Sequence, residues 1–189
     1  LGYNRRALFL HRAAQQVIDR FEGELPQNLT ELESLSGVGP ATARSIAAFA
    51  FNAPVVFIET NIRRVFIHHF FPEETDVSDK KLLPLIERAL PERRAREWYW
   101  ALMDYGSHLG RVLPNPNRRS RHYVRQSAFI GSKREIRGHV LRLLVDGALK
   151  ETQLADALRG FSYQGREIIE QLIAEGFIER RGTSLQLKR

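Results

Sequence analysis

The chain has 189 residues, 43% of them hydrophobic, and its 29 Lys and Arg residues exceed its 22 Asp and Glu residues to give a net charge of +7. This hydrophobic content is sufficient to fill a core, which excludes a disordered chain. The chain has no cysteine, which excludes disulfides, thiolate zinc sites and cysteine-ligated iron–sulfur clusters. The basic excess favours a polyanionic partner, although a basic protein that is merely soluble has the same balance.

The first half of the chain has the pattern of a helical domain. Apolar residues recur at three to four positions over residues 4–21, which predicts an amphipathic helix. We expect further helices over residues 28–35, 41–51, 60–70, 78–90 and 94–109. Asn28 or Thr30 is the expected N-cap of the second helix, and Trp98 and Trp100 are expected in the core. These signals predict an all-α domain of about six helices.

The pattern changes after Gly110. Residues 111–132 are rich in Pro, Asn and Arg, and we expect a basic, partly helical connector there. Apolar spacing then predicts three helices, over residues 133–144, 152–158 and 164–175, with Gly176 as a C-cap. Two short β-prone stretches flank Arg181-Gly182-Thr183, which is typical of a hairpin. Three helices followed by a β-hairpin predict a small winged-helix domain over residues 133–189.

The most informative string is L-S-G-V-G-P-A-T-A over residues 35–43, between two expected helices. Its glycines permit a tight turn that a Cβ would obstruct. Backbone N–H groups of such a turn, at the start of a helix, form an anion site that suits a DNA phosphate. The contact would position the protein without reading the base sequence. The string predicts DNA binding by Gly37, Val38, Gly39, Ala41 and Thr42, with an ordinary helix–turn–helix joint as the alternative.

This string resembles the hairpin of the endonuclease III and MutY group of helix-hairpin-helix DNA glycosylases. Three other stretches resemble motifs of that group in the same order: residues 1–7 resemble L-G-Y-Y-x-R-A, residues 58–65 resemble L-D-G-N-V-x-R-V, and residues 101–106 resemble A-M-M-D-L-G. Glu59 also lies twenty positions after Gly39, as the catalytic Asp of the group does. The resemblance implies a mainly α fold: a helix-hairpin-helix glycosylase domain over residues 1–110, ahead of the connector over 111–132 and the winged helix.

The resemblance assigns the catalytic role to Glu59. Cleavage of a glycosidic bond develops positive charge on the sugar, and a nearby carboxylate stabilises that charge. The family uses an Asp at the start of a helix facing the flipped nucleotide, whereas Glu59 is one methylene longer. A misplacement of about 1 Å at such a site costs ~100-fold in rate. The alternatives are a capping Glu, which the helix dipole favours, or a degenerate site.

The sequence differs from the family at two places, and these differences argue against a lyase reaction and against an iron–sulfur cluster. Bifunctional members carry a Lys two residues after the second hairpin glycine, and its amine attacks the sugar. Ala41 occupies that position, which predicts a monofunctional glycosylase without efficient lyase activity. Many relatives have four cysteines after the region matching residues 101–110, but this chain has none, so no iron–sulfur cluster and no other cofactor is expected. Arg118, Arg119 and Arg121 are expected to contact phosphates there, or to belong to a solvated linker.

The resemblance also suggests roles for two arginines and a tyrosine. Of Arg63 and Arg64, one is expected to pair with a carboxylate and the other to contact a phosphate. Tyr3 is expected to stack near the DNA wedge or to pack as a terminal residue. No metal centre is expected, although the carbonyls of Leu35 and Val38 are candidates for a monovalent cation. The family's general acid and base pocket would lie before Leu1.

Together these features predict an intracellular enzyme of base-excision repair, in the cytoplasm at a bacterial or archaeal nucleoid or in a nucleus. Its partner would be double-stranded DNA with a mispaired or damaged base, and adenine opposite 8-oxoguanine or guanine is the first substrate expected. Glycosylases for mismatched thymine or uracil, or for oxidised pyrimidines, are alternatives. So are a non-catalytic DNA-binding or lesion-sensing module and a winged-helix regulator with an unrelated helical domain. The winged helix itself is expected to contact DNA phosphates or a protein partner.

Overall fold

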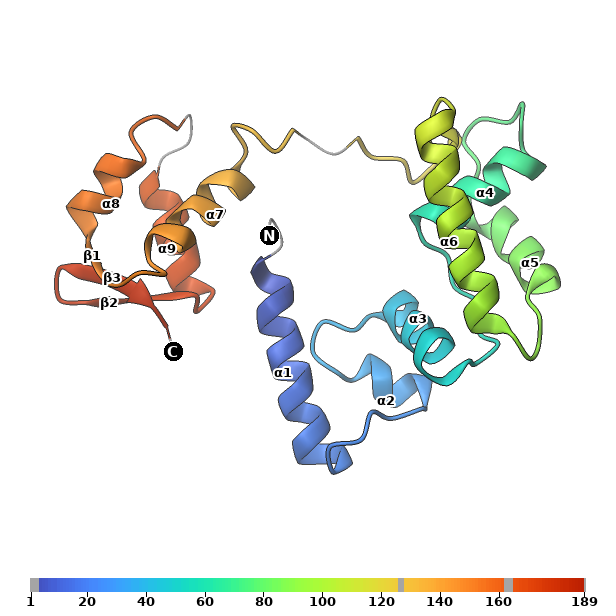
Figure 1. Ribbon diagram of the computed structural model, residues 1–189, viewed down its shortest axis with the longest axis horizontal. Helices are drawn as coiled ribbons and strands as arrows, with labels where there is room; N and C mark the ends of the chain where they lie inside the picture. Colours follow the sequence, from blue (N-terminus) through green and yellow to red (C-terminus); the bar gives the residue numbers. More distant parts are fainter. Residues whose placement is uncertain (1–3, 126–127, 162–164, 189) are drawn as a thin grey trace. The chain divides into compact units, whose positions relative to one another are not determined.

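The computed structural model describes residues 4–125, 128–161 and 165–188. Tyr3 lies outside this range. The chain divides into two compact units, one of Leu10–Arg125 and one that comprises the chain beyond Arg125 together with the residues before Leu10. The helical elements and the small sheet are labelled in Figure 1. Within the described residues, no helix combines the length and the hydropathy that a membrane span requires.

The first unit is helical, as predicted. Its elements in chain order are α1 (Asn4–Phe21), of which the part from Leu10 onward belongs to this unit, α2 (Leu29–Glu33), α3 (Pro40–Phe51), α4 (Thr60–Phe70), α5 (Asp79–Ala89), α6 (Ala95–Val112) and the 3₁₀ helix η1 (Pro116–Arg119). Local signals set several ends. The Asn28 side chain caps α2, as expected, because its Oδ1 accepts from the amides of Thr30 and Glu31 at 2.8 and 3.3 Å. Pro40 begins α3, where its fixed φ suits the first turn.

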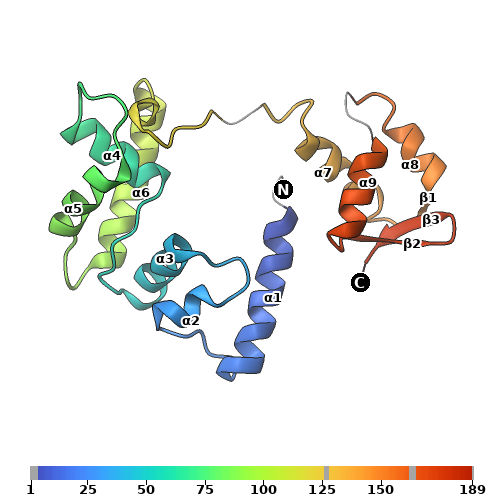
Figure 2. The same ribbon diagram turned by 180° about the vertical axis from the view of Figure 1, so that it is seen from behind.

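Two apolar cores hold this unit together. The smaller one lies among α1, α2 and α3 and is built on Leu32, Leu35, Ala43 and Ala47. The larger one lies among α4, α5 and α6, whose packing is visible from behind in Figure 2. Val55, in the stretch between α3 and α4, packs against both cores. That stretch therefore connects the hairpin region to the helices that follow it.

Helices α4 and α6 approach each other closely at Gly106. A Cβ on Gly106 would lie 2.3 Å from the carbonyl oxygen of Asn61, so a larger residue does not fit. The Arg64 guanidinium occupies the space beside Gly110, where a Cβ would lie 2.7 Å from Nη1. Nη1 of Arg64 donates to Oδ1 of Asn61 at 2.7 Å and to the carbonyl of Gly106 at 2.6 Å. One side chain thus joins the first turn of α4 to the middle of α6.

An ion pair joins α4 to the start of α5. Nε and Nη2 of Arg63 each donate to Asp79 at 2.8 Å, the bidentate geometry that guanidinium and carboxylate groups favour. Both side chains are largely buried, with 16% of Arg63 and 24% of Asp79 exposed. The hydrogen bonds from Arg63 lower the pKa of Asp79 from its ordinary value, against the opposing effect of desolvation.

The beginning of the expected connector belongs to the first unit. Helix α6 continues to Val112, and residues 113–122, which we call the strap, lie along α4 and the loop before α5. The Val77 amide donates to the Arg119 carbonyl at 2.8 Å, and the Arg121 amide donates to the Val77 carbonyl at 3.0 Å. Sequence composition gave no sign of these pairings, because they involve residues far apart in the chain.

One core assignment from the sequence is wrong. Trp98 is half-buried and packs against the larger core, as expected, but 53% of Trp100 is exposed. Two positions along a helix turn the side chain by roughly 200°, so both indoles cannot face one core. Trp100 instead stacks on Phe49 at its edge, with ring centroids 6.4 Å apart.

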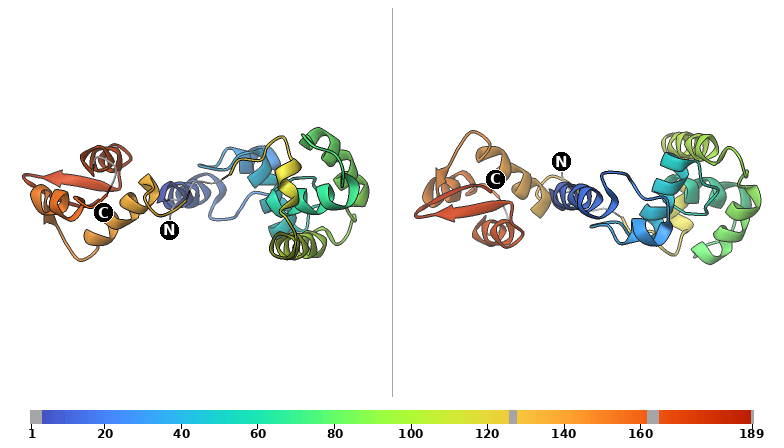
Figure 3. Two further views of the ribbon diagram at one scale, coloured as in Figure 1. Left: turned by 90° about the horizontal axis from the view of Figure 1, so that it is seen from above. Right: turned by 90° about the horizontal axis from the view of Figure 1, so that it is seen from below.

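The second unit has the predicted winged-helix arrangement. Its elements are α7 (Lys133–Leu143), β1 (Leu149–Lys150), α8 (Glu151–Ala157), α9 (Gly165–Ala174), β2 (Ile178–Arg181) and β3 (Ser184–Leu187). The strands form an antiparallel sheet in the order β1-β3-β2, seen beside the helices in Figure 3. Gly176 ends α9 with a φ of 79°, as a C-cap requires. The two-residue β1 was not predicted, since so short a strand leaves no periodic signal.

Substituting Gly106 by Ala should destabilise the first unit by about 3 kcal/mol, because the new methyl group would collide with the backbone of Asn61. Gly138→Ala is the matched control. Gly138 lies inside α7 with open space around its Cβ position, so Ala should stabilise that unit by about 0.5–1 kcal/mol. Chemical denaturation followed by circular dichroism measures both, and an unchanged stability of the Gly106→Ala variant would contradict the close contact.

The ion pair of Arg63 and Asp79 should make stability depend on pH. Because the folded-state pKa of Asp79 is depressed, its contribution is present above the ordinary value of 3.8 and is lost as pH falls through the folded pKa. Asp79→Asn should therefore be less stable than the wild type at pH 7, and the gap should narrow by pH 3. Urea unfolding at both pH values tests this, and a gap that widens on acidification would exclude the assigned direction.

Candidate active site

The glycine turn between α2 and α3 has the backbone geometry that the sequence predicts. Gly37 has a φ of 77°, a left-handed conformation that favours glycine. The Val38 amide donates to the Leu35 carbonyl at 3.1 Å and closes the turn. The Ser36 amide donates to Oε1 of Gln16 at 2.7 Å, which ties the turn to α1. The turn is therefore anchored on both sides.

Among the residues that the structure describes, none accepts a hydrogen bond from the first amides of α3. Gly39 is its N-cap and provides no side-chain cap, and the first amide to bond back into the helix is that of Ala43, which donates to the Gly39 carbonyl at 2.9 Å. The amides of Ala41 and Thr42 precede it and have no intrahelical acceptor. Gly39, Ala41 and Thr42 are all exposed. This arrangement can accept an anion from solvent.

Gly39 is not required by the fold. Its φ of −95° is accessible to any residue, and nothing lies within 4 Å of the position that a Cβ would take. The space beside Gly39 is therefore open, and close approach of a ligand to the backbone is sterically possible there.

Glu59 caps α4 with one carboxylate oxygen. Its Oε1 accepts from the amides of Asn61 at 2.5 Å and Ile62 at 2.9 Å. The capping role that the sequence offered as an alternative is therefore present. Among the residues that the structure covers, Oε2 has no hydrogen-bond partner, and the side chain is partly exposed. The carboxylate is held in one orientation, at a helix N-terminus that favours its negative charge, with one oxygen left for a ligand.

Most of the arginines expected at DNA are engaged within the first unit. Arg63 pairs with Asp79, and Arg64 bonds α4 to α6. Arg119 donates to the carbonyl of Ile67 at 3.4 Å and to that of Pro72, while Arg118 is exposed. Arg63, Arg64 and Arg119 therefore make contacts inside the protein.

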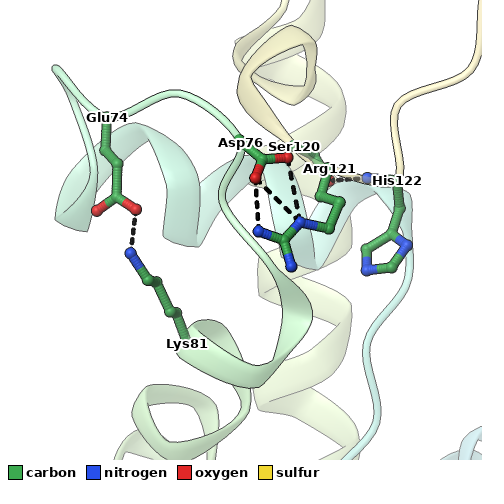
Figure 4. Close-up of polar contacts among 6 residues, drawn as sticks. All are labelled: Glu74, Asp76, Lys81, Ser120, Arg121 and His122. Carbon is green, nitrogen blue, oxygen red and sulfur yellow. Dashed lines mark hydrogen bonds and ion pairs between the residues drawn. The ribbon is translucent and has the colours of Figure 1, made fainter.

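Arg121 lies in an exposed ion pair at the far end of the strap. It pairs with Asp76 at 2.5 Å, as Figure 4 shows, and 57% and 63% of the two side chains are exposed. In the same view the His122 amide donates to Oγ of Ser120, and Lys81 pairs with Glu74. Exposed pairs of this kind contribute little to stability. They leave Arg121 accessible to an outside anion.

Sequence reasoning missed the buried asparagine of the strap. Asn117 is only 4% exposed, and its Nδ2 donates to the Thr60 carbonyl at 2.9 Å, directly after Glu59. The only signal was the P-N-P-N string at residues 114–117, which also fits a solvated turn. The monovalent cation site at Leu35 and Val38 stays a prediction. No group of three His, Asp or Glu residues that could hold a metal ion occurs in the described part of the chain.

Comparisons with known proteins show similarity to DNA glycosylases. A model of the helix-hairpin-helix motif matches residues 20–49, which include the turn. The adenine DNA glycosylase of Mycolicibacterium smegmatis is 27% identical over 95% of this chain and 68% of its own length. The adenine DNA glycosylase of Buchnera aphidicola is 32% identical over 57% of this chain and 31% of its own length. The thymine/uracil-DNA glycosylase of Methanothermobacter thermautotrophicus is 29% identical over 55% of this chain and 48% of its own length.

The chain thus spans about two thirds of the first of these relatives and less than half of each of the other two. The chain thus has a helix-hairpin-helix motif in a mainly helical fold and is similar in sequence to helix-hairpin-helix DNA glycosylases.

Proposed function

We propose that the protein is a monofunctional DNA N-glycosylase of base-excision repair. One observation carries the proposal: a turn with exposed amides and an oriented carboxylate with one unbound oxygen occur in the same compact unit. The turn binds a phosphate of the duplex through the amides around Gly39, Ala41 and Thr42. Glu59 then acts on the sugar of an extruded nucleotide.

The reaction needs a negative charge beside the sugar. As the bond from C1′ to the base nitrogen breaks, its electron pair leaves with the base, which takes up a proton. The sugar becomes electron-poor, and Oε2 of Glu59 stabilises it until water adds to C1′. Ala41 supplies no amine for attack on the sugar. The product is therefore an abasic site on an unbroken strand.

Adenine opposite 8-oxoguanine or guanine is the proposed substrate. Two relatives, from Mycolicibacterium smegmatis and Buchnera aphidicola, are named adenine DNA glycosylases, and support this choice. A relative named thymine/uracil-DNA glycosylase makes mismatched thymine or uracil the second candidate. Base excision measured on duplexes that contain each of these pairs distinguishes the two candidate substrates.

One observation favours a non-catalytic alternative. Glu59 already uses Oε1 to cap α4, and capping alone accounts for a Glu at a helix N-terminus. A protein that only binds DNA through the turn would have the same contacts. The activity of a Glu59 variant separates the two functions.

Glu59→Gln should lower the single-turnover rate of base excision by ~100-fold or more, because the neutral amide cannot stabilise charge on the sugar. The full-length protein is assayed on duplexes with A:8-oxoguanine, G:T, G:U and oxidised pyrimidines, with alkali to reveal abasic sites. Glu87→Gln, an exposed change on α5, is the control and should leave the rate unchanged.

Absence of excision on every duplex would contradict the enzyme and support the binding module. Strand breaks without alkali, together with a covalent complex trapped by borohydride, would refute the monofunctional reaction.

Gly39→Ala should weaken binding to a duplex about tenfold without lowering the melting temperature. The added methyl group meets nothing within 4 Å in the protein, so only an approaching phosphate is obstructed. A hydrogen bond to a charged group is worth about 1.5 kcal/mol or more, which corresponds to tenfold in Kd. Ser107→Ala, an exposed change on α6, is the control. Equal affinity of the Gly39→Ala variant and the wild type would exclude this turn as the phosphate site.

A further inference from the structure

The strap contacts the first turn of α4 from outside the helix. Nδ2 of Asn117 donates to the carbonyl of Thr60 at 2.9 Å. Oδ1 of Asn115 accepts from Nε of Arg64 at 3.1 Å and from the amide of Asn117 at 3.2 Å. The two asparagines and Arg64 therefore form one connected set of hydrogen bonds, which begins one residue after Glu59.

Arg64 extends this set into α6. Its Nη1 donates to Oδ1 of Asn61 and to the Gly106 carbonyl, at 2.7 and 2.6 Å. Asn61 is the residue whose amide donates to Glu59. The Arg64 guanidinium thus contacts the side chain of Asn61, while Asn117 contacts the backbone of Thr60. Thr60 is therefore held from outside α4, and Asn61 is held by Arg64 of α4 itself, whose guanidinium is in turn bonded to α6.

Asn117 has a polar atom that its surroundings do not satisfy. The residue is 4% exposed, and Oδ1 of Asn117 is buried without a hydrogen-bond partner among the described residues. An unsatisfied buried polar atom destabilises the folded state, whereas an apolar side chain of similar shape avoids that cost. Asn at this position is therefore poorly explained by stability, and its one bond is directed at the turn that bears Glu59.

We propose that Asn117 and Arg64 are positioning residues, which fix the first turn of α4 so that the free oxygen of Glu59 lies at the sugar. This rests on the proposed function of Glu59. The strap holds this turn through hydrogen bonds, from Asn117 to the Thr60 carbonyl and from Arg64 to Asn115. The other end of the strap is attached separately. There the backbone of Val77 bonds to Arg119 and Arg121, and the Arg121 side chain pairs with Asp76 (Figure 4).

The test compares Asn117→Ala and Arg64→Lys with the wild-type full-length protein. Two readouts are needed: amide hydrogen exchange of Asn61 and Ile62 by NMR, and the single-turnover excision rate beside the Kd for the same duplex. Lys81→Gln is the control, because it removes an exposed ion pair near the strap without touching α4. Arg64→Lys keeps the charge but loses the planar set of donors.

In Asn117→Ala we expect the Asn61 and Ile62 amides to exchange at least tenfold faster while the rest of α4 keeps its protection. Excision should slow by ~100-fold, as expected for a displacement of about 1 Å, and Kd should stay within about twofold. Arg64→Lys should show a larger effect in the same direction. The control should match the wild type in both readouts.

Unchanged exchange at both amides in the folded Asn117→Ala variant would overturn the proposal, whatever the excision rate. So would a variant with fast exchange and wild-type excision, provided that Glu59→Gln is inactive. If Glu59→Gln excises normally, the proposed function fails on its own, and the exchange measurement still decides whether the strap fixes the turn. Loss of protection throughout α4 would indicate a stability role and would also overturn the proposal.

Discussion

The bond from the Arg64 guanidinium to the Gly106 carbonyl is the interaction on which the site depends. It is possible because α6 carries glycine at two positions one helical turn apart. Gly106 lets the backbone of α4 come within contact distance, and Gly110 leaves the space that Arg64 fills. A charged donor in a part-buried location bonds more strongly than a neutral one. The first turn of α4 is thus fixed against a rigid neighbour, and Glu59 stands at the end of that turn.

Glu59 caps α4 with one carboxylate oxygen and leaves the other for the chemistry that we propose. A capping side chain uses one oxygen to accept backbone amides, which leaves the second oxygen unbound. The amides orient the group, and the helix dipole favours its anionic form. Capping and catalysis are compatible in this geometry, and the proposed function needs both.

Much of the fold could be predicted because it is encoded locally. Apolar spacing predicted the helices, Asn28 and Gly176 were recognised as caps, and Gly37 has the positive φ that its turn requires. The hairpin of the winged helix followed from Arg181-Gly182-Thr183 and its flanking residues. Each of these signals acts within a few residues, so the sequence around it is sufficient.

The partners of the arginines could not be predicted in the same way. An arginine that reaches a phosphate and one that bonds a distant carbonyl have identical sequence signals, and only the fold shows that Arg64 faces Gly106 and that Arg119 faces Ile67. The strap was hidden for the same reason, since the pairing of Val77 with residues 119 and 121 joins segments more than forty positions apart. The prediction for Trp100 was wrong because it relied on the aromatic content of the helix. The position of a residue around the helix axis determines whether it faces the core, and Trp100 lies on the exposed side.

A crystal structure of the full-length protein on a duplex with a charged abasic-sugar analogue tests the central claim most directly. The account predicts a phosphate oxygen within hydrogen-bonding distance of the amides at the start of α3. It also predicts Oε2 of Glu59 against the analogue, with Oε1 still bound to the amides of α4. A phosphate held elsewhere, or a Glu59 carboxylate turned away from the sugar, would contradict it.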